Sequence, residues 1–528
     1  MRKLFACIVA AVLSVSAVPA QAETPRDVLV MAFTIDDIIT LDPAEIFEFT
    51  AAEYAGNTYD RLIGYDPEDV SNIFGVAAES WTISDDGKTF TFKMRQGVKF
   101  ASGNPMRAED AAFSLQRAII LDKSPAFILT QFGFTADNVR EKIRATDDMT
   151  LVIETDKAYA PTFVLYCLTA TISSIVDKEL VMQHAEGDDL GYNWLKTNYA
   201  GVGPFKLNAW KANESLILDR NDDYWGGAPA MKRVIIRHIV ESATQQLLLE
   251  KGDVDIARNL GPDQLDSIRN NPDTYIQDGV KGSVYYLGLN QKHEALSKPQ
   301  VRQALKYLVD YQGMEGTVVK DLMSIHQAFL PKGFLGALEA TPFHLDVGKA
   351  KELLAEAGYP NGFKVTMDTR SISPIMEMAQ SIQSTFAQAG VELEIIPGDG
   401  GQTLGKYRAR NHDIYIGRWG PDYQDPHTNA DTFARNPDNG DDAKSKPLAW
   451  RNAWDIPEMT KVADAAVLER DPAKRAELYL EIQKIHQATS PFVIMFQQTE
   501  VAGIRADTEG FIIGPAFDDN RYGGVTKK

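Results

Sequence analysis

The sequence predicts a mixed α/β fold, and two observations lead to this prediction. Short runs in which apolar and polar residues alternate, as in strands, are interspersed with segments whose apolar residues recur at helical spacing. In the second half of the chain the two kinds of segment follow one another in regular order. Strand–helix–strand order is typical of parallel or mixed sheets that are covered by helices.

Strand signals dominate the first half. Residues 28–33 form an apolar run, and residues 81–83 and 90–94 flank the turn sequence 84–87, which is typical of a hairpin. A helix is expected for residues 109–118, where apolar side chains recur at helical spacing. Further strands are expected at 206–207, 216–218 and 232–239, followed by a helix at 243–250.

The second half predicts a more regular alternation. Strands are expected at 284–289, 363–367, 391–395, 413–416 and 492–498, and helices at 299–309, 347–357, 375–389 and 472–487. Asp346 is placed to cap the helix at 347–357, and Gly358 and Pro360 follow its end. Asp471 and Pro472 are typical of a helix start.

Residues 1–22 have the features of a secretory signal peptide. Arg2 and Lys3 precede the apolar residues 4–18, and residues 20–22 (Ala-Gln-Ala) form a small-x-small cleavage sequence. An uncleaved anchor is the alternative, but this stretch is shorter than the roughly 20 residues that span a bilayer. We therefore expect export, a mature chain that begins at Glu23, and no segment inserted in the membrane.

The chain has two cysteines, Cys7 and Cys167. Because Cys7 lies within the signal peptide, no intramolecular disulfide is expected in the mature chain. Cys167 follows the apolar run 163–166, so we expect a buried free thiol rather than a reactive one.

Charge and motifs exclude several functions. The formal net charge is −19, whereas nucleic-acid binding and docking on anionic lipid both need a basic surface. There is no phosphate-binding loop and no nucleophile elbow, and the eight histidines are scattered, so neither a cofactor nor a metal is expected. A secreted hydrolase with an unrecognised carboxylate pair remains an alternative, although acidic residues are mostly surface groups.

Several longer motifs, in order along nearly the whole mature chain, carry a family resemblance. They include the long run at 89–118, GVGPFKL at 201–207, DYWGGAP at 223–229, VRQALKYLVD at 301–310 and WGPDYQDP at 419–426. Together they resemble the extracellular solute-binding proteins of ABC importers, in the family that holds the dipeptide-, oligopeptide- and nickel-binding proteins.

The resemblance implies a two-lobed clamp with mixed sheets and an extra inserted domain. Lobe I would combine residues 23–63, 200–285 and 490–528, the inserted domain would be 64–199, and lobe II would be 286–489. The chain would cross between the lobes near 286–290 and 491–498. Both segments read as apolar strands, which suits a two-stranded hinge around a ligand.

The site prediction centres on Asp422. It follows the expected strand 413–416, and in α/β sheets ligands bind beyond the carboxyl ends of strands. In peptide-binding members the aspartate of the matching W-x-x-D motif takes the peptide's α-ammonium group, as a buried cation needs a paired carboxylate. The alternative is an aspartate in an ordinary Pro/Asp-rich turn. Gly420 and Tyr423 are expected beside it, and Trp419 is expected either to wall the pocket or to lie in the core.

Arg370 is the second candidate, at the end of the expected strand 363–367. The resemblance implies that an arginine near this point binds the carboxylate of a dipeptide, although Thr369 could occupy the matching place. A surface arginine paired with Asp368 is the alternative. Arg418 departs from the glycine of many relatives, and a cation there would either favour an anionic ligand or face solvent.

The expected function is capture of a short peptide by a monomeric periplasmic protein, which delivers it to a membrane-bound ABC permease. Other ligands carried by this fold remain open, namely an opine, an oligosaccharide, haem or a metal chelate. A periplasmic chaperone or receptor is a third class of function. Catalysis is not expected.

Overall fold

The computed structural model describes residues 24–398, 400–443 and 445–528, so the signal peptide expected at 1–22 and Cys7 lie outside it. One eleven-stranded sheet runs through the molecule in the order β15-β14-β16-β12-β17-β11-β1-β10-β9-β8, with β13 paired to β17. Parallel and antiparallel pairs both occur, which confirms the predicted mixed α/β class. The strands are β1 (Val28–Phe33), β8 (Phe205–Lys211), β9 (Ser215–Arg220), β10 (Arg233–His238), β11 (Ile256–Ala257), β12 (Thr274–Leu289), β13 (Met323–Ile325), β14 (Lys364–Arg370), β15 (Glu392–Gly398), β16 (Ile414–Trp419) and β17 (Phe492–Arg505).

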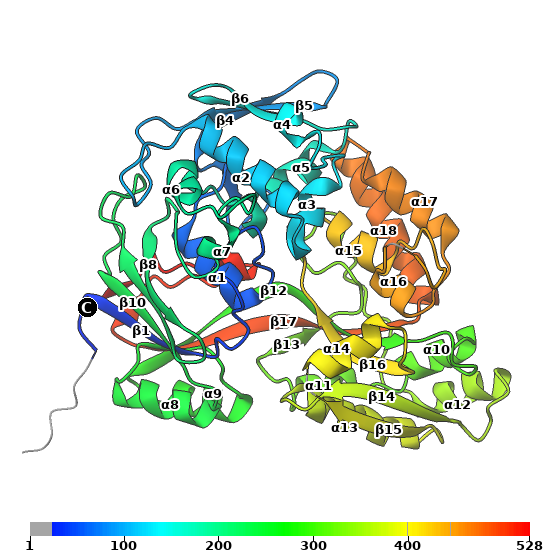
Figure 1. Ribbon diagram of the computed structural model, residues 1–528. Coiled ribbons are helices and arrows are strands. Elements are labelled where there is room, and N and C mark those ends of the chain that lie inside the picture. The colour runs from blue at the N-terminus through cyan, green and yellow to red at the C-terminus, as the bar shows by residue number, and fades with distance from the viewer. Residues whose placement is uncertain (1–23, 399, 444) are drawn as a thin grey trace, which may run out of the picture.

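Two long strands join the halves of this sheet. β12 and β17 cross the middle of the molecule, with β1 and β8–β11 on one side and β14–β16 on the other (Figure 1). Both strands are longer than the sequence predicted, because polar residues interrupt their apolar patterns. Their antiparallel pairing is irregular between Val280 and Val284, opposite Thr499 and Gln497. This irregularity lies several residues before the crossing that the sequence suggested at 286–290.

A separate four-stranded sheet lies at the top of the molecule in Figure 1, in the order β4-β5-β7-β6. Its strands are β4 (Ala78–Ile83), β5 (Thr89–Met94), β6 (Ile143–Asp147) and β7 (Thr150–Glu154), and β4 and β5 form the predicted hairpin. Helices α2 (Ala108–Leu121) and α5 (Pro161–Leu168) pack their apolar faces into a core with Phe90, Phe92 and Phe132. Cys167 on α5 is fully buried there, as expected.

Helix starts follow the capping signals. The Asp346 carboxylate accepts the Lys349 N–H at 2.8 Å, and Asp471 accepts the Ala473 N–H at 2.9 Å. The helix expected at 299–309 ends earlier, at Lys306, because Asp310 caps a new short helix, α11 (Tyr311–Glu315). The other main helices are α1 (Phe49–Thr58), α8 (Ser242–Lys251), α9 (Pro262–Asn270), α10 (Pro299–Lys306), α12 (Val347–Glu356), α13 (Ile375–Ala387), α14 (Gly400–Arg408), α15 (His427–Phe433), α17 (Pro457–Ala466) and α18 (Pro472–Thr489).

Separate hydrophobic cores form on either side of the crossing strands. One side packs α1, β1, β8–β10 and the C-terminal segment around residues such as Tyr54 and Tyr522. The other side packs α10, α12 and α13 against β14–β16, with a second cluster around Tyr286 and Phe433. None of the helices in the described part of the chain is long and apolar enough to cross a membrane.

Candidate ligand-binding site

A cavity lies between the two halves of the sheet. Its walls come from residues 46–52 at the start of α1, 169–172 after α5, 420–424 after β16, and 515–518 near the C-terminus, together with Tyr65, Pro125, Ile128 and Ser283. The cavity holds about 760 Å³ of space, its open mouth included.

The cavity wall is mostly apolar, and its charged residues are all acidic. They are Glu48, Asp422 and Asp518, and no lysine or arginine is among the described residues that line it. Asp518 is neutralised by Arg61, whose Nη2 lies 2.8 Å from Oδ2. Burial raises the pKa of Glu48. Two carboxylates, those of Glu48 and Asp422, therefore face the cavity without a cationic partner among the described residues, which favours a ligand that carries a positive charge.

Asp422 is positioned by the loop that follows β16. Its backbone N–H donates to Thr428 Oγ1 at 3.1 Å, and the Thr428 hydroxyl lies 3.4 Å from Asp422 Oδ2. Burial raises the pKa of the Asp422 carboxyl to about 7, opposed by the Thr428 hydrogen bond and reinforced by the negative charge of Asp431. The side chain is partly buried and forms no ion pair within the described part of the chain.

Gly420 and Tyr423 also line the cavity. A Cβ at Gly420 would lie 3.2 Å from Ser283 Oγ and 3.3 Å from the ring of Phe49, so a side chain there would press on both neighbours. Tyr423 is almost fully buried, and its ring lies 5.8 Å from that of Phe163 on α5. The loop after β16 thus touches both α1 and the core beneath the four-stranded sheet.

Trp419 and Arg370 lie elsewhere. The Trp419 ring packs against Phe433 at 6.4 Å, and its buried indole N–H has no hydrogen-bond partner within the described residues. Arg370, at the end of β14, is exposed, with its guanidinium near Gly400. Neither is among the described residues that line the cavity. Asp368 forms its ion pair with Lys406, so the pairing of Asp368 with Arg370 that the sequence left open is not seen.

Aromatic residues from the two ends of the chain complete the wall. Phe49 and Phe517 stack with ring centroids 4.1 Å apart, and both line the cavity. Neither residue was predicted from the sequence, because nothing in the local pattern indicates that α1 and the C-terminal segment meet. Figure 1 shows α1 and the red C-terminal segment side by side above the crossing strands.

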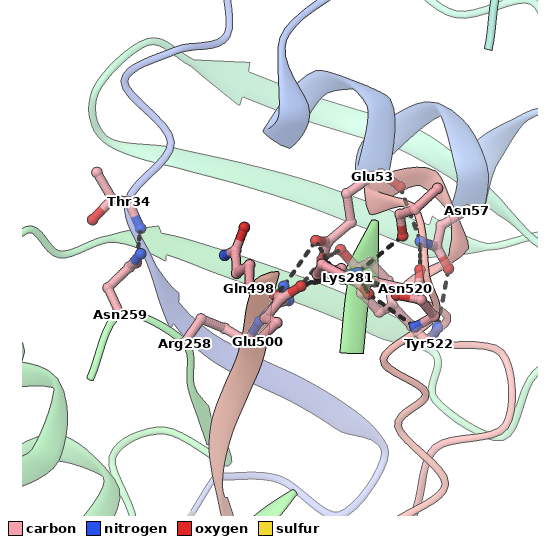
Figure 2. A network of polar contacts seen from close by, with 12 residues as sticks. Thr34, Glu53, Asn57, Arg258, Asn259, Lys281, Gln498, Glu500, Asn520 and Tyr522 are labelled. Atoms are coloured by element: carbon pink, nitrogen blue, oxygen red, sulfur yellow. Dashed lines mark hydrogen bonds and ion pairs between the residues drawn. The ribbon is translucent and has the colours of Figure 1, made fainter. Parts of the chain in front are cut away.

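A buried polar network holds this C-terminal segment (Figure 2). Lys281 Nζ, in the irregular stretch of β12, donates to the carbonyls of Gly514 and Ala516 at 2.6 and 2.9 Å and to Asn520 Oδ1 at 2.7 Å. It also lies 3.0 Å from Glu500 Oε2 on β17. One lysine therefore ties the crossing strands to the segment that lines the cavity.

The same network is balanced in charge. Arg258 pairs with Glu53 on α1 at 2.7 Å and with Glu500, so two cations face two carboxylates. Although burial disfavours the charged form of Glu500, the cations of Arg258 and Lys281 hold its pKa well below its usual range. Such a network is stable only while every member keeps its partners.

No group of three or more histidine, cysteine or acidic side chains with the geometry of a metal site occurs among the described residues. The lining of the cavity is mostly apolar, with the carboxylates of Glu48 and Asp422 in its wall.

Comparison with known proteins identifies the family. The family model of the bacterial extracellular solute-binding proteins, family 5 (Middle), matches residues 72–441. The chain belongs to this family. Its members are ABC-type solute-binding proteins that serve transport and bind small ligands such as peptides, and they are not enzymes.

Similar proteins match almost the entire chain. The probable D,D-dipeptide-binding periplasmic protein DdpA of Escherichia coli K12 is 29% identical over 522 residues, which cover 97% of this chain and 96% of that protein. The glutathione-binding protein GsiB of Salmonella paratyphi A is 24% identical, with 96% of each chain covered. The solved structure of the Helicobacter pylori periplasmic binding protein DppA, in complex with the peptide STSA, superposes with a TM-score of 0.79 at 25% identity, covering 95% and 98% of the two chains. The two-lobed periplasmic binding fold is thereby confirmed.

Proposed function

We propose that this family 5 solute-binding protein captures a short peptide in the cavity and delivers it to a membrane-bound ABC permease. The observation that carries the proposal is Asp422, a carboxylate in the wall of a mostly apolar cavity that has no cationic partner in the described part of the chain. A peptide's α-ammonium group would supply the missing charge. The names of the relatives, which include a D,D-dipeptide binder, a glutathione binder and a protein solved with the peptide STSA, support a short peptide.

The residues around the cavity have separate roles in this proposal. Asp422 binds the ammonium group through a charge-assisted hydrogen bond. Gly420 keeps the wall free of a side chain. Phe49 and Phe517 supply apolar surface from the opposite half of the sheet. Trp419 supports the loop from behind through its packing on Phe433.

Capture follows from contacts that only the closed arrangement provides. Asp422 and Gly420 follow β16 in one half of the sheet, whereas Phe49 lies on α1, which packs with the other half, and Phe517 stacks on Phe49. A ligand held by both halves favours closure by as much as its affinities for the two states differ. The crossing strands β12 and β17 would be the hinge between lobe I and lobe II. Lobe I would comprise residues 23–63, 200–285 and 490–528, with the inserted domain at 64–199, and lobe II would comprise residues 286–489. Arg370 is not needed for this arrangement, and its binding of a ligand carboxylate stays a prediction.

The proposal includes export. A signal peptide at 1–22 would place the mature chain in the periplasm, which agrees with the periplasmic location in the name of the DdpA relative. N-terminal sequencing of protein from the periplasm of the source bacterium should read from Glu23.

Mass spectrometry of small molecules released by denaturing the purified protein tests the ligand class. We expect short peptides that rebind in isothermal titration calorimetry. Asp422→Ala should weaken that binding by about 2–5 kcal/mol, because it leaves the ammonium unpaired. Asp188→Ala, at an exposed aspartate outside the cavity, is the matched control and should bind as the wild type does. A sugar or a metal chelate as the released molecule would overturn the peptide assignment.

A further inference from the structure

Arg418 is a cation that the fold leaves without an anionic partner beside the cavity. It is partly buried, and none of the carboxylates in the described ranges lies within ion-pair distance of its guanidinium. Within the described residues, the guanidinium donates one hydrogen bond, to Gln498 Oε1 at 3.3 Å. None of its nitrogens is among the buried side-chain atoms of the described residues that lack a partner, so the remaining N–H groups are open to solvent and available to a ligand.

The aromatic pair of the cavity wall holds this guanidinium in place. Its central carbon lies 4.3 Å from the ring centroid of Phe49 and 5.7 Å from that of Phe517. Both rings line the cavity. A planar guanidinium stacked on a ring keeps its N–H groups at its edge, where they can bind a carboxylate with two hydrogen bonds.

The charges around the cavity suggest which ligand would use these donors. Asp422 offers a negative charge in the loop after β16, and Arg418, four residues earlier, offers a positive charge at the end of the same strand. No lysine or arginine lines the cavity among the described residues, and Arg370 is exposed beside Gly400. Of the two arginines that the sequence singled out, Arg418 is the one in contact with the cavity wall.

We propose that Arg418 binds an anionic group of the ligand, so that the protein selects zwitterionic ligands with an ammonium group at Asp422 and a carboxylate at Arg418. This inference rests on the proposed function. It narrows the ligands to peptides that have a free carboxyl terminus and are short enough for that terminus to reach Arg418. To receive the carboxylate, the guanidinium keeps its contact with Phe49 and adds hydrogen bonds through its free edge.

The test uses D-Ala-D-Ala, L-Met-L-Leu and L-Ala-L-Ala-L-Ala, each as the free acid and as the C-terminal amide, in isothermal titration calorimetry. Wild-type protein should bind the free acid of at least one peptide tenfold or more tightly than its amide. Arg418→Met keeps the packing against Phe49 but removes the charge. In this variant the affinity for the free acid should fall to the affinity for the amide. The affinity for the amide should stay within about twofold of its wild-type value. Arg418→Lys should recover part of the preference.

Each other outcome decides against the inference. If Arg418→Met lowers the affinities for the acid and for the amide equally, Arg418 acts only through its stacking on Phe49 and Phe517. Wild-type binding that depends on Asp422 but does not distinguish acid from amide would leave the proposed function standing and overturn this inference alone. Absence of binding by every acid and amide would overturn the peptide proposal and this inference with it. Thermal melts of the ligand-free variants show whether each one folds.

Discussion

The raised pKa of Asp422 predicts that the empty site destabilises the protein at neutral and alkaline pH. The carboxyl has a pKa near 3.8 in the unfolded chain and about 7 in the folded one. Between these values the folded state binds more protons than the unfolded state, so the free energy of unfolding falls as the pH rises from about 4 to about 7. This is opposite to the usual behaviour of a carboxylate held in an ion pair. Asp422→Asn keeps the acceptor for Thr428 and removes the titration.

The magnitude follows from the shift. About three pKa units at 1.36 kcal/mol each give a penalty of up to about 4 kcal/mol at pH 8. Asp422 is partly exposed, so solvent screening reduces the expected value to about 2 kcal/mol. With an unfolding entropy of about 2.1 cal/mol/K per residue, roughly 500 residues give about 1 kcal/mol/K, and Tm should rise by about 2 °C.

Differential scanning calorimetry of the ligand-free proteins at pH 8 and pH 4.5 provides the measurement. Asp422→Asn should melt above the wild type at pH 8 and together with it at pH 4.5, while it loses affinity for ammonium-bearing peptides at both. A variant that melts lower than the wild type at pH 8 would refute the reasoning, and so would a gain of equal size at both pH values. Asp188→Asn, at an exposed site, should show neither effect.

Three further predictions concern buried groups. Arg475→Met removes the cation that binds the buried Asp425 carboxylate at 2.6 and 2.7 Å. In urea unfolding the variant should lose about 3–5 kcal/mol of the free energy of unfolding. A loss under 1 kcal/mol would contradict the pairing. Lys281→Met releases residues 514–520 from β12 and should weaken peptide binding more than tenfold in calorimetry, whereas unchanged affinity would show that the segment is held by other contacts. Cys167 is fully buried, and burial raises the pKa of its thiol, so a maleimide should label it only after unfolding; rapid labelling of the native protein would disprove this.

Local structure was predictable where a few adjacent residues determine it. The turn at 84–87 gives the β4–β5 hairpin, and Asp346 starts α12 where the capping signal placed it. The long strands were underestimated because Lys281 interrupts the apolar pattern of β12. Its polar partners lie in residues 500–520, far along the chain, and no local pattern reveals them.

The site was predictable only in part, for a similar reason. Asp422, Gly420 and Tyr423 line the cavity because the loop after β16 opens at its edge. Successive residues of a strand point to opposite faces, so Arg418 meets Phe49 while Trp419 meets Phe433 on the other side. The sequence alone does not fix which face of β16 turns toward the ligand. Arg370 ends β14, which β16 separates from the crossing strand β12.

The position of β17 near the end of the chain determines when the fold can form. β17 lies between β12 and β11 in the sheet and also pairs with β13, yet it is synthesised last among the strands of this sheet. Until residues 492–505 have emerged, the nascent chain holds two partial sheets with unpaired edges, which are prone to mispairing. Pairing over such long sequence separations is also slow. For the export that residues 1–22 predict, this order means that the complete sheet can form only once the segment that contains β17 is available.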